Sequence, residues 1–351
     1  MASRPLYTPH PAALSALFGD VASFAASQPQ VFIGTAGSLL KRENANNFRF
    51  YARQYYDGEG KKREGYVAGP IGDPGADATA MAMRARIDQV KAQTADLRML
   101  GREGFQIVDP RTYATLASLH NYSIFRAGGV LIGSHAFGVL LNQLGVRAAA
   151  YATEDIDIAR RERLGFETLP DASFLQMLCD SGVQFMELPT LDPRHPPSRF
   201  GLAGRARFHV DLLVPSPDAG MTTVPVPELQ TRATSLPYLR YGLGESSLTP
   251  VLAREGCCMV RVPTPERFAV HKLIASQLRS NRDAKTNKDI QQACTILAVL
   301  AERHPDAIEG ALERVPVSAK RYLRAALVLA RPQLELAHPR AWEALSEPSR
   351  A

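Results

Sequence analysis

The sequence predicts an α/β (α+β) protein with a small mixed β-sheet core, an N-terminal extension of β-meander and helices, and a helical C-terminal region. Three observations predict this fold. Residues 31–70 hold β-rich pieces separated by turns with Asn and Gly, residues 105–263 alternate short apolar runs with helical segments, and beyond Pro265 the pattern is helical. We therefore expect three parts, at residues 1–104, 105–263 and 264–351.

The N-terminal part is predicted to contain a meander between two helical stretches. Residues 9–28 have the pattern of one amphipathic helix or two short ones. Strands are expected at 48–56 and 65–68, on either side of the turn DGEGKK. Residues 79–103 have the period and composition of a long helix.

The same signals predict the remaining elements. Strands are expected at 128–132, 153–160 and 205–215 and at several places within 221–263. Helices are expected at 110–120, 135–146, 171–182, 265–280, 288–303, 307–313, 317–330 and 332–346.

Bulk composition sets broad limits on the class of protein. The net charge of +6 and pI of about 9.2 are compatible with a polyanionic partner without requiring one. The four cysteines lack metal-ligand spacing, which indicates reduced thiols in a cytoplasmic protein. No apolar run is long enough to span a bilayer, so we expect no membrane partner.

An acidic pair marks the strand expected at 153–160. Residues two apart on a strand share a face, so Asp155 and Asp157 project side by side while Ile156 and Ile158 face the core. Adjacent carboxylates repel unless a cation lies between them, and carboxylate oxygens suit Mg²⁺. The alternative is a pair of solvated acids at a strand end. Glu154 points the other way and is left out of the ligand set.

Two further features fit a site beside this pair. Asp211 lies in the middle of the apolar strand FHVDLLV, where a lone charge is costly unless it shares a metal with the pair. Gly133 and Ser134 stand where a strand turns into a helix, and the free N–H groups of a helix N-terminus suit phosphate. The alternative for this turn is an ordinary helix cap.

Together these motifs resemble the nucleotidyltransferase superfamily related to DNA polymerase β. The residues that carry the resemblance are IGSHAFGVLLNQ, TEDIDIA and HVDLLV, and it covers roughly residues 124–290. The chain is similar to uncharacterised bacterial nucleotidyltransferases and, more distantly, to transferases of the abortive-infection toxin type. One departure is a longer interval between Ser134 and Asp155, and we expect the surplus, LGVRAAAYAT, to loop out between helix and strand.

The resemblance implies a role for each motif. Asp155 and Asp157 would hold two metal ions, Mg²⁺ or Mn²⁺, and Asp211 the catalytic one. Gly133 and Ser134 would hold the triphosphate of an NTP. Lys272 would approach the nucleotide, although a lysine on an apolar helix can simply extend to solvent, and Lys288 with Asp289 forms a second candidate pair.

The implied function is a metal-dependent transfer of NMP from an NTP to an acceptor, with release of pyrophosphate. An RNA 3′ end is slightly favoured as acceptor, because the meander at 31–70 mixes basic and aromatic residues that suit RNA. A solvated basic face with the aromatics packed on the core is the alternative for this meander. The alternative functions are a catalytically degenerate nucleic-acid- or partner-binding protein, and a transferase acting on a small molecule or a protein.

The roles of charged residues close to these acids stay open in the sequence. His209 is on the same strand face as Asp211, and we interpret it as a passive neighbour of the site. Arg160 and Arg161 follow the acidic strand and either contact phosphate or screen the acids. The basic residues of the helix at 79–103 are interpreted as its exposed side.

Overall fold

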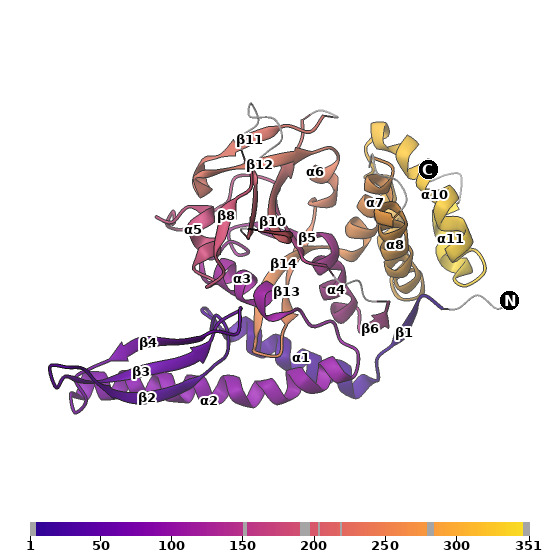
Figure 1. The fold of residues 1–351 in the computed structure, drawn as a ribbon. Helices are drawn as coiled ribbons and strands as arrows, with labels where there is room; N and C mark the ends of the chain where they lie inside the picture. Colours follow the sequence, from indigo (N-terminus) through magenta and orange to yellow (C-terminus); the bar gives the residue numbers. More distant parts are fainter. Residues whose placement is uncertain are drawn as a thin grey trace.

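The structure is a computed structural model that describes residues 5–149, 153–189, 197–202, 204–217, 220–278 and 284–346. Within these ranges no helix combines the length and apolar character needed to cross a membrane. A central mixed sheet lies between a projecting N-terminal meander and a group of C-terminal helices (Figure 1). This arrangement confirms the predicted fold class.

The N-terminal extension is a three-stranded antiparallel sheet lying along a long helix (Figure 1). The strands pair in the order β2-β3-β4, which confirms the meander. Phe32, Ala36 and Ile87 form a small buried cluster between sheet and helix. The elements are β1 (Tyr7–Pro9), α1 (Ala12–Ser27), β2 (Ser38–Glu43), β3 (Arg49–Tyr56), β4 (Lys62–Ala68) and α2 (Pro74–Arg102).

Helix α2 begins earlier than the sequence pattern predicts. The Asp73 side chain accepts a hydrogen bond from the Ala76 N–H, and Pro74 occupies the first turn. An aspartate cap followed by proline is a strong helix start, because proline has no N–H to leave unsatisfied there. The apolar period of the prediction begins only at residue 79, so it missed this first turn.

The central sheet is mixed and has the strand order β11-β12-β10-β7-β5, with β9 pairing to β10 and β8 to β9. Strand β10 is parallel to β7 and β12, whereas β5 is antiparallel to β7. The elements of this region are α3 (Pro110–Asn121), β5 (Gly129–Ile132), α4 (Gly133–Gln143), β6 (Val146–Ala148), β7 (Asp155–Arg160), α5 (Phe174–Cys179), β8 (Phe185–Glu187), β9 (Arg199–Leu202), β10 (Arg205–Pro215), β11 (Thr223–Val226), the 3₁₀ turn Pro227–Leu229, β12 (Thr231–Leu236) and α6 (Leu239–Gly242).

The segment expected to loop out between Ser134 and Asp155 contains a strand instead. Val146–Ala148 forms β6, which pairs antiparallel with β1 near the N-terminus. The prediction was wrong here because the partner strand lies far away in the sequence and is only three residues long. Residues 150–152 of the same segment lie outside the described residues.

A separate hairpin and the C-terminal helices complete the fold. Strands β13 (Ser246–Leu252) and β14 (Cys257–Pro263) pair antiparallel, and β14 packs beside α3 and β5. The helices are α7 (Pro265–Ser276), α8 (Ala284–Arg303), α9 (Pro305–Glu313), the 3₁₀ turn Val317–Ala319, α10 (Lys320–Leu334) and α11 (Pro339–Ser346). The helix predicted at 332–346 was wrong in its start, because Pro332 lies inside α10.

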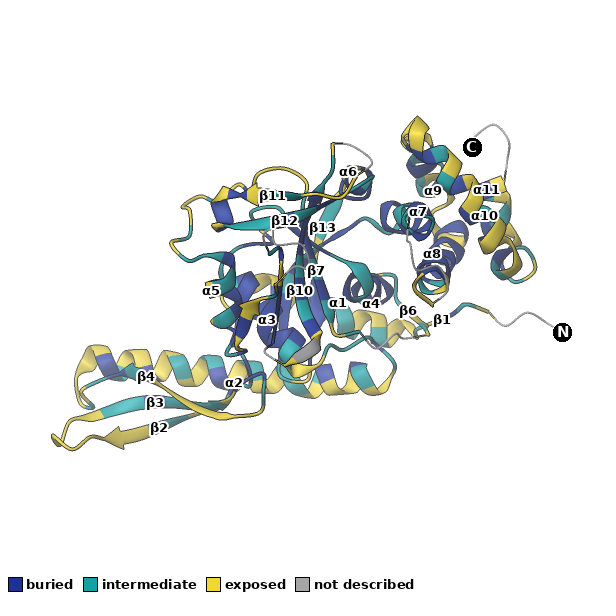
Figure 2. Ribbon diagram, turned by 45° about the horizontal axis from the view of Figure 1, so that its top comes forward, coloured by how far each residue is buried: buried dark blue, intermediate teal, exposed yellow. Residues whose placement is uncertain are grey.

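One large core joins these parts. It contains residues as far apart as Tyr7 and Leu345, together with Ile156 and Ile158 of β7. The central strands are largely buried, whereas much of α2 and β2 is exposed (Figure 2). The predicted boundaries after residues 104 and 263 stay predictions.

Candidate active site

The two aspartates of β7 lie on the face that the strand alternation predicts. Ile156 and Ile158 are 0% and 1% exposed in the core, while Asp155 and Asp157 line a cavity. Strand β7 is held between β5 and β10, so its position is fixed from both sides. Both carboxylates therefore face the same space from a rigid element.

Strand pairing brings the third aspartate to this pair. In the parallel register of β7 and β10, Asp211 is opposite Asp157 and His209 is opposite Asp155. Paired positions on neighbouring strands put side chains on the same face of a sheet. Asp211 lines the same cavity as the β7 pair, so the three predicted acids come together.

The negative charge of this cluster is under-compensated at Asp157. Burial raises the pKa of Asp157, and the carboxylates of Asp211 and Asp155 raise it further, to about 6, against the opposing effect of Lys272. A partly buried carboxylate beside two others favours a proton or a cation. A cation bound beside Asp157 would therefore lower its pKa and stabilise its charged form.

Asp211 has two basic neighbours. Arg199, on β9, donates from Nε to Oδ1 at 2.7 Å and from Nη2 to Oδ2 at 3.1 Å. His209 Nε2 lies 3.5 Å from Asp211 Oδ2, and its Nδ1 lies 3.3 Å from Asp155 Oδ1. Burial acts to raise the pKa of Asp211, but the hydrogen bonds from His209 and Arg199 outweigh it and lower that pKa.

The Gly133-Ser134 turn touches the acidic cluster directly. Gly133 has a φ of +71°, and a Cβ atom there would lie 2.0 Å from Asp157 Oδ2. Glycine is therefore required by both backbone conformation and space. Helix α4 begins at this turn without a side-chain cap, and Ser134 lines the cavity with its Oγ 3.5 Å from Gln292 Nε2.

Lysines from the C-terminal helices form another wall. Lys272 of α7 is buried and donates from Nζ to Asp289 Oδ1 at 2.6 Å. Lys288 lines the cavity, and burial together with the charge of Lys272 lowers its pKa. Lys285, which the sequence analysis did not select, is exposed and lines the cavity as well.

The cavity has a volume of about 690 Å³, within the usual range of roughly 300–1,000 Å³ for small-molecule sites. All seven residues selected from the sequence line it. They are Gly133, Ser134, Asp155, Asp157, Asp211, Lys272 and Lys288.

The donor chemistry of the cavity can be compared with the needs of a divalent cation. As they stand, no three His, Cys, Asp or Glu side chains in the described part of the chain are grouped to hold a metal ion. Asp211 is instead paired with Arg199. The three carboxylates still supply the hard oxygen donors that Mg²⁺ or Mn²⁺ prefers, and Asp155, Asp157 and Asp211 line one cavity. The residues therefore fit such an ion in type.

Sequence reasoning missed or misjudged other residues near the site. Arg199 offered no signal, because its contact with Asp211 depends on the pairing of β9 with β10. His209 was interpreted as a passive neighbour, but it lies between two of the acids. Arg160 Nη1 lies 2.8 Å from the buried Glu228 Oε1, a partner that the sequence analysis did not consider.

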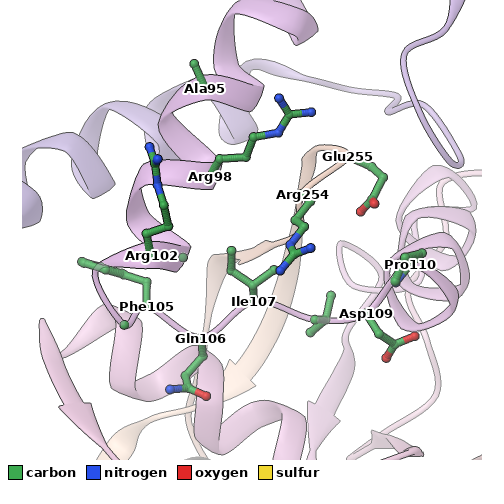
Figure 3. Close-up of a pocket in the computed structure, with 13 residues that line it drawn as sticks. Ala95, Arg98, Arg102, Phe105, Gln106, Ile107, Asp109, Pro110, Arg254 and Glu255 are labelled. Carbon is green, nitrogen blue, oxygen red and sulfur yellow. The ribbon is translucent and has the colours of Figure 1, made fainter.

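A larger cavity lies away from these acids. It has a volume of about 1240 Å³ and lies along the connector from α2 to α3, beside the β13–β14 turn (Figure 3). Arg98 and Arg102 project from α2, and Arg254 and Glu255 come from the turn. None of the seven predicted site residues lines it, so the larger cavity is not the candidate active site.

The meander has a mixed surface. Its outer face exposes an aromatic row in which the Phe48 and Phe50 rings are 6.1 Å apart and Phe50 and Tyr66 are 5.6 Å apart. Tyr66 is 62% exposed, so this row is not packed on the core. Several basic side chains are paired, with Arg42 held by Glu64, Lys61 by Glu59 and Arg63 by Asp57.

Comparison with known proteins adds an independent observation. A family model described as nucleotidyltransferase matches residues 104–316, which is more than half of the chain. The chain belongs to this nucleotidyltransferase family. No curated protein and no solved structure matches it significantly. The matched part of this nucleotidyltransferase contains β5, β7, β10 and the lysines of α7 and α8, whereas the meander lies outside it.

Proposed function

We propose that this nucleotidyltransferase moves an NMP group from an NTP to an acceptor hydroxyl and releases pyrophosphate, with Asp155, Asp157 and Asp211 as its catalytic acids. The observation that carries the proposal is the register that sets Asp211 opposite Asp157 beside the Gly133 turn. A phosphate site and a triple-carboxylate cluster in one cavity suit attack on a phosphorus atom.

The three carboxylates would hold Mg²⁺ or Mn²⁺ in this proposal. Such ions supply charge neutralisation on the triphosphate and on the oxygens that attack and leave. Asp211 would exchange its ion pair with Arg199 for the metal, which agrees with its lowered pKa because the carboxylate stays charged at neutral pH. Asp155 and Asp157 would complete the ligand set from β7.

The chain's own groups bind and orient the phosphates. The uncapped N-terminus of α4 offers N–H groups at Ser134, and the missing side chain of Gly133 allows close approach. Lys288 and Lys285 supply positive charge on the opposite wall of the cavity. Lys272, fixed by Asp289, adds charge near Asp157 from a buried position.

An RNA 3′ end is the acceptor that we favour. The exposed row of Phe48, Phe50 and Tyr66 offers ring faces on which unpaired bases can stack. Because Arg42, Lys61 and Arg63 of the meander are paired with acids, fewer basic side chains are available for RNA phosphates than the composition predicts. Stacking of bases on the aromatic rings would therefore provide most of the contact with RNA. Attack by the RNA 3′-hydroxyl on the α-phosphorus would extend the RNA by one nucleotide and displace pyrophosphate.

The test is an extension assay with a short single-stranded RNA and each radiolabelled NTP, in Mg²⁺ or Mn²⁺. We expect labelled RNA from the wild-type chain and none from Asp155→Ala/Asp157→Ala. Pyrophosphate without labelled RNA would retain the transferase and exclude RNA as acceptor. Absence of NTP binding and of any product would favour a degenerate binding protein.

A further inference from the structure

A further charged cavity lies beside α6, outside the candidate active site and the larger cavity. It has a volume of about 790 Å³ and lies where the end of β10, α6 and the C-terminal helices meet. Arginines from five separate places in the fold line it: after β7, on α6, on α7, at the end of α9 and on α10. They are Arg161, Arg240, Arg267, Arg314 and Arg321.

The carboxylates in contact with these arginines do not balance their charge. Glu245 Oε1 lies 3.2 Å from both Arg267 Nη2 and Arg314 Nη1, so one oxygen serves two guanidinium groups. Glu162 pairs with Arg240 and lies 3.9 Å from Arg161. Among the described residues, the ion pairs of four of these five guanidinium groups go to two carboxylates, and Glu266 near Tyr241 is a third, so positive charge remains in excess. A concave surface with excess positive charge concentrates anions.

Arg267 shows that the cavity is more than a solvated surface patch. Arg267 is 7% exposed, and its guanidinium carbon lies 5.0 Å from the centre of the Tyr241 ring. Its Nη1 donates to the Tyr241 carbonyl oxygen at 3.4 Å, while its buried Nε has no hydrogen-bond partner in the structure. A buried donor without a partner is costly, so the Arg267 guanidinium carries incompletely satisfied positive charge beside the cavity.

This arginine cavity and the candidate active site are separate. They share no lining residue. Between them lies α6, whose Leu239 and Gly242 line a small cavity of about 120 Å³ together with Asp157 and Lys272. The arginine cavity is lined by Arg240 and Tyr241 of the same short helix. An occupant of the arginine cavity would thus contact one side of α6 and the catalytic acids would lie beyond the other.

We propose that the arginine cavity binds a compact phosphorylated anion of the nucleotide or oligophosphate type. Guanidinium groups match phosphate oxygens with paired, charge-assisted hydrogen bonds. The cavity volume suits a nucleotide-sized ligand. Arg161 and Arg321 are exposed at the cavity, so they can turn toward an incoming anion. The proposal needs no metal ion and does not depend on the transfer reaction.

Isothermal titration of the full-length chain with sodium tripolyphosphate or ATP, in EDTA, tests this site. We expect the double variant Arg161→Gln/Arg321→Gln to bind tripolyphosphate at least about tenfold more weakly than the wild type. The matched control is Arg84→Gln/Arg340→Gln, which removes the same charge from exposed positions outside the cavity and should bind like the wild type. Tighter binding of ATP identifies nucleotide recognition, and equal binding identifies oligophosphate recognition.

Two further arms keep the outcome decisive. Lys288→Gln alters the candidate active site, so we expect it to weaken any tripolyphosphate binding there while the binding that depends on Arg161 and Arg321 keeps its affinity. If binding is lost in Lys288→Gln and kept in Arg161→Gln/Arg321→Gln, the anion site is the active site and the proposal is overturned, while the transferase proposal stands. Arginine-dependent binding of a short RNA without binding of tripolyphosphate would also overturn it. If the double variant melts early, the exposed Arg321→Gln alone should still weaken binding severalfold.

Discussion

Asp157 is expected to destabilise the metal-free protein, so replacing it should increase stability while removing activity. Its pKa is raised from 3.8 to about 6 because burial and the charges of Asp211 and Asp155 disfavour the carboxylate. A shift of roughly 2 units corresponds to about 3 kcal/mol at neutral pH. Asp157→Asn removes that charge at nearly the same volume. We therefore expect it to raise the free energy of unfolding by about 2–3 kcal/mol at pH 7.5.

The pH dependence separates this explanation from a general packing effect. A carboxyl group whose folded-state pKa is raised is more protonated in the folded chain, so the folded state loses stability as pH rises from 3.8 to about 6. The advantage of Asp157→Asn should be absent near pH 3.8, reach about half its full size at pH 5 and stay constant above pH 7.

Urea unfolding in EDTA at several pH values measures this difference, with Asp88→Asn on the exposed face of α2 as control. The control should match the wild type at every pH. The reasoning is refuted if Asp157→Asn is no more stable than the wild type at pH 7.5, or if its gain is the same at pH 4 and pH 7.5.

Three further predictions follow from contacts around the cavity. Gly133→Ala should cost about 2 kcal/mol or more in urea unfolding and abolish pyrophosphate release, because its Cβ meets Asp157 at 2.0 Å; Gly60→Ala, with a similar φ of +75° and open space, is the control, and equal costs would exclude the clash. The Arg199→Ala variant should bind Mn²⁺ severalfold more tightly than the wild type, because the ion pair that competes for Asp211 is lost. Electron paramagnetic resonance of free Mn²⁺ measures this affinity, and weaker binding would contradict the competition. Lys272→Met should lower the free energy of unfolding by about 3 kcal/mol, because it removes the 2.6 Å ion pair of a buried aspartate, whereas the exposed Lys285→Met should change it by less than about 0.5 kcal/mol. A loss no larger than that of the Lys285 variant would contradict the buried role of Lys272.

The local features of the site could be predicted from the sequence because each depends on short-range geometry. The alternation Asp-Ile-Asp-Ile assigns faces within β7, and FHVDLLV identifies the middle of β10. The glycine before Ser134 marks the turn into α4. These signals need no knowledge of distant partners, and they led to residues that line one cavity.

The contacts near the site that sequence reasoning missed depend on pairing between distant segments. Arg199 reaches Asp211 only because β9 pairs with β10 in one register. The sequence analysis grouped Asp289 with Lys288, its neighbour in the chain. In the fold Asp289 pairs with Lys272 instead, because α7 packs on α8. The strand at Val146–Ala148 exists because β1 lies beside it. Such contacts are determined by the tertiary fold, so the local periodicity of apolar residues in the sequence does not predict them.

Pyrophosphate release measures the central claim most directly. The wild-type chain is incubated with each NTP, the RNA acceptor and Mg²⁺ or Mn²⁺, beside Asp157→Asn, the variant expected to be at least as stable. The account predicts metal-dependent release by the wild type with at least one NTP and none above background by Asp157→Asn. Equal release by the two chains would contradict the assignment of Asp157 as a catalytic acid.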